Sequence, residues 1–284
     1  MSRYRTTRIH RHVLYLTVVT MSTVCIFSWT RPENDENSNV NVVGYYQTSG
    51  SNALAASVVI RFFRSVYPTA PLYIHYDTDH AIPTSGADLI THNENQVDKS
   101  AVSKGMYFSS VIAMEAYIQR IKTAAGLQKN GWVLLLEDDV WVWAGIKQND
   151  LKYDSTGRCR HKFSIECAGC LTAIRAHSRD RQAFRNESCY GAYGGTYLNS
   201  SRILGLKYNH GLLQDLLSSV KIGAVASDLL LSSVILVDGG SIGDNPGFYE
   251  PYDLSQLFSN IKYGPPNIFH LMKWLYLMRY IFDY

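Results

Sequence analysis

Apolar and polar positions alternate along this chain with two different periods. Short apolar runs at 41–46, 72–76 and 132–136 are typical of strands buried on both faces. Between them, apolar residues recur at spacings of three and four, which predicts a helix from Ser51 to Tyr67 and a second over 103–125. Alternation of strand and helix predicts an α/β domain with a mostly parallel sheet flanked by helices.

The pattern is less regular in the second half of the chain. Residues 144–190 carry charge and little periodicity, which predicts a looped insertion or lid. Helices are expected over 204–220 and, with Ser227 as its cap, over 228–235. Residues 268–281 carry an amphipathic pattern that would pack on the core or, alternatively, lie on a membrane face; we favour core packing.

A glycine pair interrupts the segment from 192 to 198, which is expected to form a strand or a turn. Gly194 and Gly195 would let the backbone approach a ligand closely, because glycine has no Cβ. An ordinary tight turn explains the pair nearly as well.

Three consecutive acids directly follow the apolar run at 132–136. They are Glu137, Asp138 and Asp139, and apolar residues resume at Val140. The carboxyl end of a buried strand is where ligands of open α/β sheets bind. Adjacent carboxylates repel one another unless they share a cation, so a hard divalent metal with oxygen ligands is predicted here. A solvated loop is the alternative, and the apolar residues that follow favour the metal site.

The N-terminal region is expected to target the chain to a membrane. An apolar segment without charges, 12–29, follows four arginines, and at 1.5 Å per residue it would span roughly 27 Å. Arginines before such a segment hold that end in the cytoplasm. We predict a cytoplasmic tail over 1–11, a signal-anchor over 12–29, a polar stem over 30–40 and a luminal domain over 41–284. A cleaved signal peptide is the alternative.

The formal charge of the chain is +3, but the four arginines of the tail dominate it. Without them, the remainder carries about −1. A nucleic-acid-binding domain needs a basic patch of its own, so this class of partner is excluded.

The cysteines fit an oxidising compartment. One of the five, Cys25, lies in the predicted anchor, and an even number remains: Cys159, Cys167, Cys170 and Cys189. Two disulfides are expected, with their pairing open. A zinc site is the lesser alternative because the spacing is irregular. Asn186 and Asn199 begin triplets that accept N-linked glycans in a lumen.

Together these pieces resemble the Golgi-type glycosyltransferases of the GT-A fold. The resemblance covers about 41–245 and rests on pieces in a fixed order: the segment Val42–Gln47, the strand-end Asp77, Leu136–Val140 in the place of the DxD motif, and Ala226–Asp228 in the place of a late acidic motif. It implies one Rossmann-like catalytic domain, held in the Golgi or ER membrane as a type II protein.

The resemblance also implies a metal and a donor. In such enzymes the DxD acids bind Mn²⁺ or Mg²⁺, which neutralises charge on the leaving diphosphate of a nucleotide sugar. A UDP-sugar donor and a hydroxyl of a glycan or glycoprotein acceptor are implied. Asp139 would be the metal ligand, joined by Glu137 where the family commonly has Asp. Asp138 would bind the donor and point toward its sugar, or else toward the backbone. A late histidine, His270 or with less support His210, would complete the set.

The remaining site residues follow from the same resemblance. Tyr45, Tyr46 and Gln47 would border the nucleotide base, and Asp77 would accept hydrogen bonds from the base or ribose. Asp77 is equally suited to closing a turn. Asp228 would be the general base for the acceptor hydroxyl, which would invert the anomeric centre. An acid in the first turn of a helix is also favoured as a plain anion, so the stereochemistry stays open.

Two other functions fit the acidic triplet. A metal-dependent phosphohydrolase would use the same carboxylates, but it usually needs a second cluster of histidine and aspartate, and none stands out in the sequence. A non-catalytic relative of the GT-A enzymes would keep the fold and bind glycans. Glu137 in the place of Asp keeps that alternative open.

Overall fold

The computed structural model describes residues 40–48, 53–76, 86–92, 107–138, 140–159, 161–162, 167–178, 189–192, 194–249 and 268–270. The chain divides into two units, 1–36 and 37–284, and all described residues belong to the second. The predicted tail and anchor, Asp77 and Asp139 lie outside the described residues. Within the described part, no helix is both long and apolar enough to cross a membrane.

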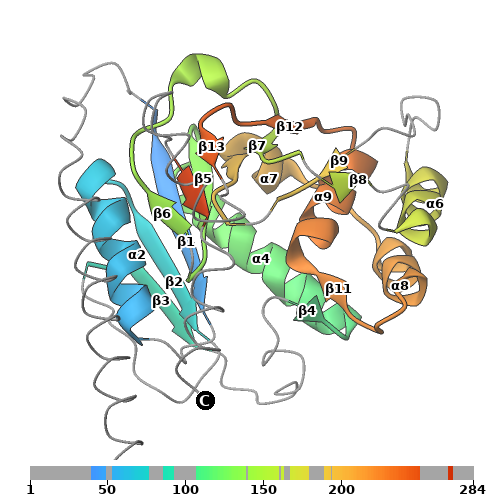
Figure 1. Ribbon diagram of the computed structural model, residues 1–284. Helices are drawn as coiled ribbons and strands as arrows, with labels where there is room; N and C mark the ends of the chain where they lie inside the picture. Colours follow the sequence, from blue (N-terminus) through green and yellow to red (C-terminus); the bar gives the residue numbers. More distant parts are fainter. Residues whose placement is uncertain are drawn as a thin grey trace, which may run out of the picture. The chain divides into compact units, whose positions relative to one another are not determined.

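A seven-stranded sheet forms the centre of the described part (Figure 1). Its order is β12 (Ile242–Asp244), β7 (Ser155–Gly157), β10 (Tyr197–Asn199), β5 (Trp132–Leu136), β1 (Val42–Thr48), β2 (Leu72–Tyr76) and β3 (Leu89–His92). β10 runs antiparallel to both of its neighbours, and the other strand pairs of this sheet are parallel. The predicted α/β class with a mostly parallel sheet is therefore confirmed.

Helices pack on both faces of this sheet. They are α2 (Ala53–Val66), α4 (Val111–Leu127), α6 (Ala168–His177), α7 (Ser200–Gly205), α8 (His210–Ser219) and α9 (Ser227–Val237). Ser110 caps α4, since its side chain accepts a hydrogen bond from the Ala113 N–H. The two helices expected in the first half are present as α2 and α4, although Tyr107–Phe108 form a short strand, β4, where the second was expected to have begun.

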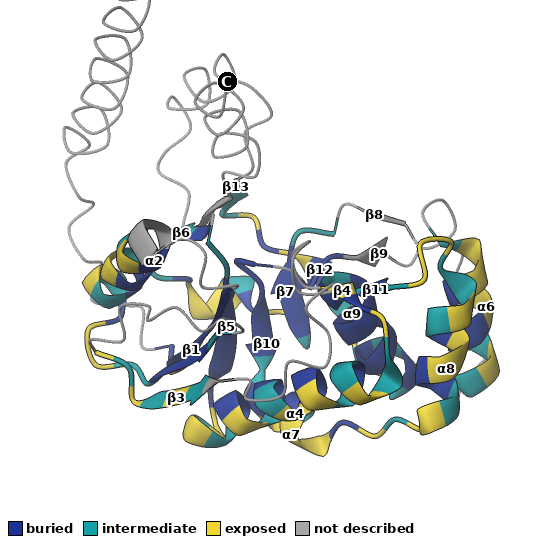
Figure 2. Cartoon of the chain, turned by 90° about the horizontal axis from the view of Figure 1, so that it is seen from below, coloured by how far each residue is buried: buried dark blue, intermediate teal, exposed yellow. Residues whose placement is uncertain are grey.

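The alternation of side chains along β1 divides the core in two. Val43 and Tyr45 pack with α4 and the later helices, whereas Val42 and Tyr46 pack with α2. The strand interiors of β1 and β5 are buried throughout (Figure 2). Burial on both faces explains their continuous apolar runs.

Short strands complete the described part. β4 pairs with β11 (Val225–Ala226), and β8 (His161–Lys162) pairs with β9 (Cys189–Tyr190). β6 (Val140–Val142) pairs with β14 (Ile268–His270), which pairs in turn with β13 (Phe248–Tyr249). A 3-10 turn, Gln148–Asp150, follows β6.

Four expectations from the sequence are wrong in detail. The segment 144–190 is not only a loop, because it supplies β7, the second strand from one edge of the main sheet, whose three residues are too few to show a period. The helix expected over 204–220 is two helices, since Asn209 caps α8 through the Leu212 N–H. Ser227 is the first residue of α9 and not its cap. Residues 268–270 are a strand, because pairing with β6 overrides their helical pattern.

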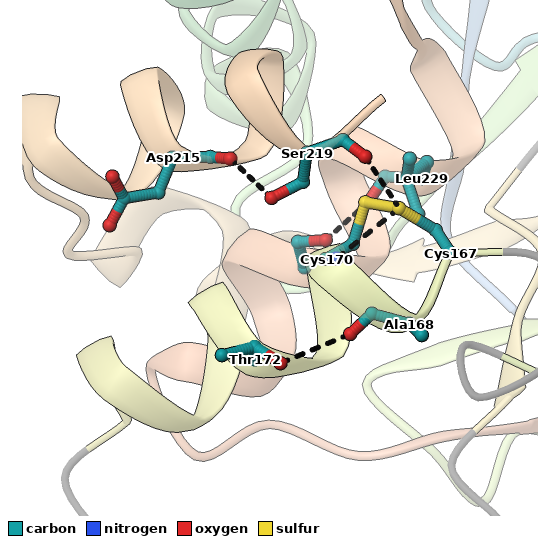
Figure 3. The surroundings of a disulfide bond; sticks show 8 residues. Cys167, Ala168, Cys170, Thr172, Asp215, Ser219 and Leu229 are labelled. Carbon is teal, nitrogen blue, oxygen red and sulfur yellow. Dashed lines mark hydrogen bonds between the residues drawn. A yellow bond between two sulfur atoms is a disulfide. The ribbon is translucent and has the colours of Figure 1, made fainter. Parts of the chain in front are cut away.

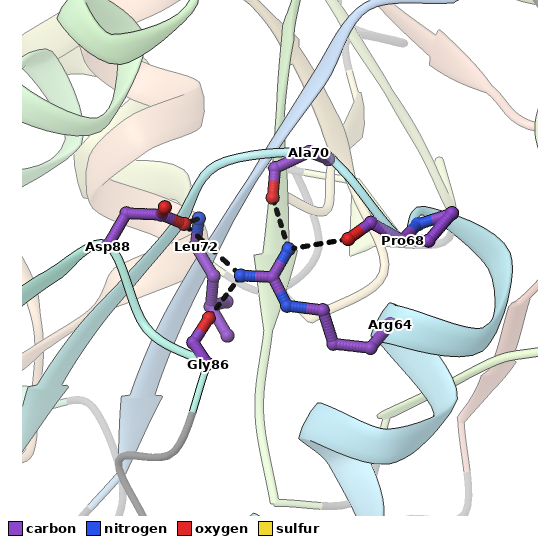
Figure 4. A network of polar contacts seen from close by, with 6 residues as sticks. All are labelled: Arg64, Pro68, Ala70, Leu72, Gly86 and Asp88. Carbon is purple, nitrogen blue, oxygen red and sulfur yellow. Dashed lines mark hydrogen bonds and ion pairs between the residues drawn. The ribbon is translucent and has the colours of Figure 1, made fainter.

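Arg64, at the end of α2, joins that helix to the neighbouring strands (Figure 4). Its guanidinium donates to four acceptors: the carbonyls of Pro68, Ala70 and Gly86, and the Asp88 carboxylate at 3.1 Å. The Asp88 carboxylate also accepts the Leu72 N–H at 2.7 Å, at the start of β2. One planar cation therefore fixes the entry into both β2 and β3.

We expect Arg64→Lys to lower the free energy of unfolding by about 1–2 kcal/mol, although it keeps the charge, because an ammonium cannot serve four separated acceptors. Arg64→Met should lose a similar amount. Urea unfolding followed by circular dichroism measures both, with Arg61→Lys on the exposed side of the same helix as the control. If Arg64→Lys had the same unfolding free energy as the wild-type chain, the charge alone would matter and the prediction would be wrong.

Candidate active site

The strand order of the sheet reverses between β1 and β5. The chain leaves β1 toward β2 on one side, and β5 leads toward β7 on the other, so the strand order reverses between them. Ligands of open α/β sheets bind at the carboxyl ends of the strands beside such a reversal. Tyr46 lies opposite Leu136 in the parallel register, so Glu137, the first residue after β5, lies level with Gln47 near the end of β1.

The acidic residues form a tight turn at this edge. The Val140 N–H donates to the Glu137 carbonyl at 3.1 Å, which closes the turn. The Glu137 carboxylate accepts the Gly194 N–H at 2.9 Å, and the Asp138 carboxylate accepts the Tyr46 hydroxyl at 2.6 Å. Both acids are partly buried. Hydrogen bonds from the turn before β10 and from β1 therefore fix the directions of these two carboxylates.

The glycine pair makes this turn possible. A Cβ on Gly194 would lie 2.5 Å from Cγ2 of Val140 and 2.9 Å from Cδ of Glu137. Gly195 has a φ of +88°, which favours glycine, and its N–H donates to the Leu135 carbonyl at 2.7 Å. The pair thus forms a tight turn whose backbone approaches the acidic turn closely.

Tyr45 and Tyr46 are buried, with 1% and 0% of their surfaces exposed. Consecutive strand residues point to opposite faces, so the two hydroxyls hold different partners. Tyr46 donates to Asp138, and Tyr45 donates to the Gln47 side chain at 2.7 Å. Of the three residues predicted to border a base, the two tyrosines therefore orient polar groups at the edge.

Arg120 is a site residue that the sequence analysis missed. It projects from α4, and its Nε donates to the Tyr45 hydroxyl at 3.3 Å. Its guanidinium carbon lies 5.9 Å from the centre of the Tyr117 ring. A half-buried cation thus lies on the same face as Tyr45. The available signal was a charge one helical turn from Tyr117 on an otherwise apolar helix face.

Tyr117 is under the electrostatic influence of two of the predicted acids. Burial raises the pKa of Tyr117 well above 10.0, the charges of Tyr45, Glu137 and Asp228 raise it further, and Arg120 opposes them. One buried phenol therefore senses both Glu137 and Asp228. The two acids belong to separate elements, because Glu137 follows β5 and Asp228 lies in α9.

Asp228 occupies the first turn of α9, as expected. Its carboxylate accepts the Leu229 N–H at 2.8 Å. The amino end of a helix favours a negative charge, so its own helix helps to hold this acid as a carboxylate.

The predicted histidine ligands differ in their placement. β14 pairs antiparallel with β6 and sets the His270 backbone opposite Val140, one residue beyond Asp139. The side chain of His270 is outside the described part. His210 begins α8, and its ring contacts the Glu115 carboxylate at 3.4 Å. Among the described side chains, no group of three or more His, Cys, Asp or Glu could hold a metal.

A polar hollow of about 430 Å³ lies at the opposite edge of the sheet. Asn41 and Trp132, which border it, stand at the starts of β1 and β5. None of the acids lines this hollow. The predicted site residues therefore lie away from this hollow.

No family model and no curated protein sequence matches this chain. Among solved structures, it is similar to the galactosyltransferase LgtC in complex with donor and acceptor sugar analogs, at 10% identity and a TM-score of 0.46, over 81% of this chain and 86% of the other. An active-site mutant of LgtC gives 11% identity and a TM-score of 0.44 over the same shares. Similarity this low does not extend the activity of those proteins to this chain.

Replacement of Gly194 tests the packing of the acidic turn. We expect Gly194→Ala to lower the free energy of unfolding by about 1–3 kcal/mol, because the new methyl group overlaps Val140 and Glu137. Gly126→Ala is the matched control, since nothing lies within 4 Å of its added Cβ in α4. The control should gain about 0.5–1 kcal/mol. Urea unfolding measures both, and equal effects would contradict the close approach.

The raised pKa of Tyr117 predicts a loss of stability in alkali. The folded state holds this proton more tightly than the unfolded chain, so the contribution is complete below pH 10.0 and declines as the pH rises further. Tyr117→Phe should reduce the slope of unfolding free energy above pH 10 by up to about 1.4 kcal/mol per pH unit. Part of the slope will remain, because burial also raises the pKa of Tyr197 and Tyr67.

The control for this measurement is Phe108→Leu, a core change beside Tyr117 that alters no titrating group. It should lower stability equally at every pH. An unchanged alkaline slope in Tyr117→Phe would contradict the prediction.

Proposed function

We propose that this chain is a GT-A-type glycosyltransferase that moves a sugar from a nucleotide-sugar donor, a UDP-sugar, to a hydroxyl of a glycan or glycoprotein. One observation carries the proposal. Glu137 and Asp138 leave the central strand at the reversal of strand order, and hydrogen bonds from Gly194 and Tyr46 hold them there. Carboxylates fixed in this position suit a cation and the diphosphate that accompanies it.

The donor set fits Mn²⁺ or Mg²⁺. Carboxylate oxygens are hard ligands, and a carboxylate accepts at several positions, so a hydrogen bond from the protein and a metal bond are compatible. We propose that Asp139 and Glu137 hold the ion, joined by His270, whose backbone lies beside the turn. When bound, the ion would neutralise the charge that develops on the departing diphosphate.

The other residues of the site bind and orient the reactants. Tyr46 sets the direction of Asp138, and Tyr45 sets that of Gln47 at the end of β1, where we place the base and ribose with Asp77. Arg120 supplies a positive charge on the same face, which suits an anionic donor.

Asp228 is our proposed base for the acceptor. Its charge raises the pKa of Tyr117, and the charge of Glu137 does the same. We take this as support for a position on the same side of the sheet as the acidic turn. There it would take the proton from the attacking hydroxyl, which inverts the anomeric centre.

The location of the enzyme is part of the same proposal. We place it in the Golgi or ER membrane as a type II protein, with residues 12–29 as the signal-anchor. Disulfide bonds at Cys159 and between Cys167 and Cys170 support an oxidising lumen.

Turnover with a panel of nucleotide sugars tests the proposal. The full chain would be incubated with each donor and Mn²⁺ or Mg²⁺, and nucleotide release would be followed. We expect release from one class of donor, its loss in Asp139→Ala, and a reduction of about tenfold in Tyr46→Phe, because Asp138 then loses a charge-assisted hydrogen bond. Asp150→Asn, in the 3-10 turn, is the control and should retain full activity.

The alternative functions give different results. Phosphate release from simple phosphate esters would favour the phosphohydrolase. A folded chain that binds glycans but releases nucleotide from no donor would favour the non-catalytic relative. Calorimetry that detects no metal binding, even with UDP present, would contradict the proposed transferase activity.

A further inference from the structure

A disulfide bond joins Cys167 and Cys170 at the start of α6 (Figure 3). Their Cα atoms are 5.2 Å apart, and only two residues lie between them in the chain. Cys167 is the cap residue of α6, and its sulfur accepts the Cys170 N–H at 3.2 Å. This bond links one turn of a helix to its own cap and crosses to no other element.

The two sulfurs differ in access and in electrostatic setting. The Cys170 residue is fully buried, whereas Cys167 is partly exposed. A sulfur that accepts an N–H at the amino end of a helix is stabilised as a thiolate. An incoming thiolate can reach the outer sulfur, and the inner one is the leaving group. A loop this short also constrains the unfolded chain little, so the bond adds little as a structural crosslink.

We propose that Cys167–Cys170 is a thiol–disulfide exchange site, which takes a dithiol or the disulfide of a dithiol oxidoreductase. A thiolate of the partner attacks Sγ of Cys167, the bond to Cys170 breaks, and Cys170 leaves as a thiolate that takes up a proton. The second thiol of the partner, as a thiolate, then attacks the mixed disulfide and releases Cys167. Two electrons and two protons pass to the chain, and the partner becomes a disulfide.

The site is connected to α9 by close packing. The first turn of α6 lies against the end of α8, where a Cβ on Gly169 would be 3.0 Å from Cβ of Ser219 and Sγ of Cys167 is 3.9 Å from the Ser219 carbonyl. In the disulfide this last distance is a contact and not a hydrogen bond, because Sγ of Cys167 carries no proton. Leu229, in the first turn of α9, lies beside the disulfide (Figure 3).

Reduction therefore has a predicted structural consequence. Two separate sulfurs need more room than a bonded pair, and the buried Cys170 belongs to the same core cluster as Leu216 of α8 and Leu229 of α9. We expect the first turn of α9 to become more mobile. Leu229 follows Asp228, so exchange at this site would modulate the proposed base; only this last link rests on the proposed function.

A redox titration of the folded, full chain tests the exchange site. Samples would be equilibrated with oxidised and reduced dithiothreitol, their free thiols alkylated, and the cysteines mapped by mass spectrometry. We expect the Cys167–Cys170 pair to open before the disulfide at Cys159, which serves as the internal control. After reduction, Cys167 should alkylate at least about tenfold faster than Cys170.

Two variants identify the attacked sulfur. Cys170→Ala should form a stable mixed disulfide at Cys167 with glutathione disulfide, whereas Cys167→Ala should react far more slowly. If either variant fails to fold, the alkylation rates of the reduced wild-type chain decide the same point. Opening of the Cys159 bond first, or reduction only after circular dichroism shows unfolding, would overturn the exchange site.

Hydrogen exchange of the amides at 227–233, before and after reduction, tests the connection to α9. Faster exchange is the expected result, and unchanged exchange overturns the connection. These measurements use no sugar donor, so their failure is distinguishable from a failure of the proposed transferase.

Discussion

Mutual repulsion between neighbouring carboxylates is the constraint around which this end of the sheet is organised. Glu137 and Asp138 follow one another directly, and each accepts a hydrogen bond from a different part of the chain. Those donors come from the turn before β10 and from β1. The acids therefore depend on both neighbours of β5, and the sheet has to be assembled before the turn can be held. Folding and the formation of the site are in this sense one process.

Side chains of β1 alternate between the two faces of the sheet, so its polar contacts are divided between the two cores. Tyr46 faces α2 and holds an acid, whereas Tyr45 faces α4 and meets Arg120. A shift of β1 by one residue would exchange the two faces and separate both hydroxyls from their partners. Burial of large apolar surfaces on both sides prevents such a shift, so the core fixes the register that the polar contacts need.

The sequence predicted the first half of this fold well because its strands are apolar throughout and its helices have a clear period. β2 and β5 have the expected limits. The strand β7 was missed because Ser155, Thr156 and Gly157 carry no apolar signal, and their strand conformation is set by pairing with β10 and β12. The strand at 268–270 depends on distant pairing in the same way.

The site was predictable in position but not in detail. Three acids after an apolar run pointed to the edge of the sheet, yet nothing local indicated that Gly194 would contact Glu137 or that Tyr46 would reach Asp138. Such contacts join residues that are far apart in the sequence. Arg120 was missed for the same reason, since its partner Tyr45 lies on another element.

The reversed direction of β10 has a consequence for how this protein could diversify. Because β7 is parallel to β5 in sense and β10 opposes both, the chain leaves β7 and re-enters β10 at the edge where the acids lie. The whole excursion between Gly157 and Tyr197 begins and ends there. Changes of length within its loops would leave β7 and β10 in place, whereas Gly194 and Gly195 at its end and the buried face of α6 have to be kept. Selection could thus vary the loops of this excursion while the acids after β5 and the glycine that contacts them stay constant.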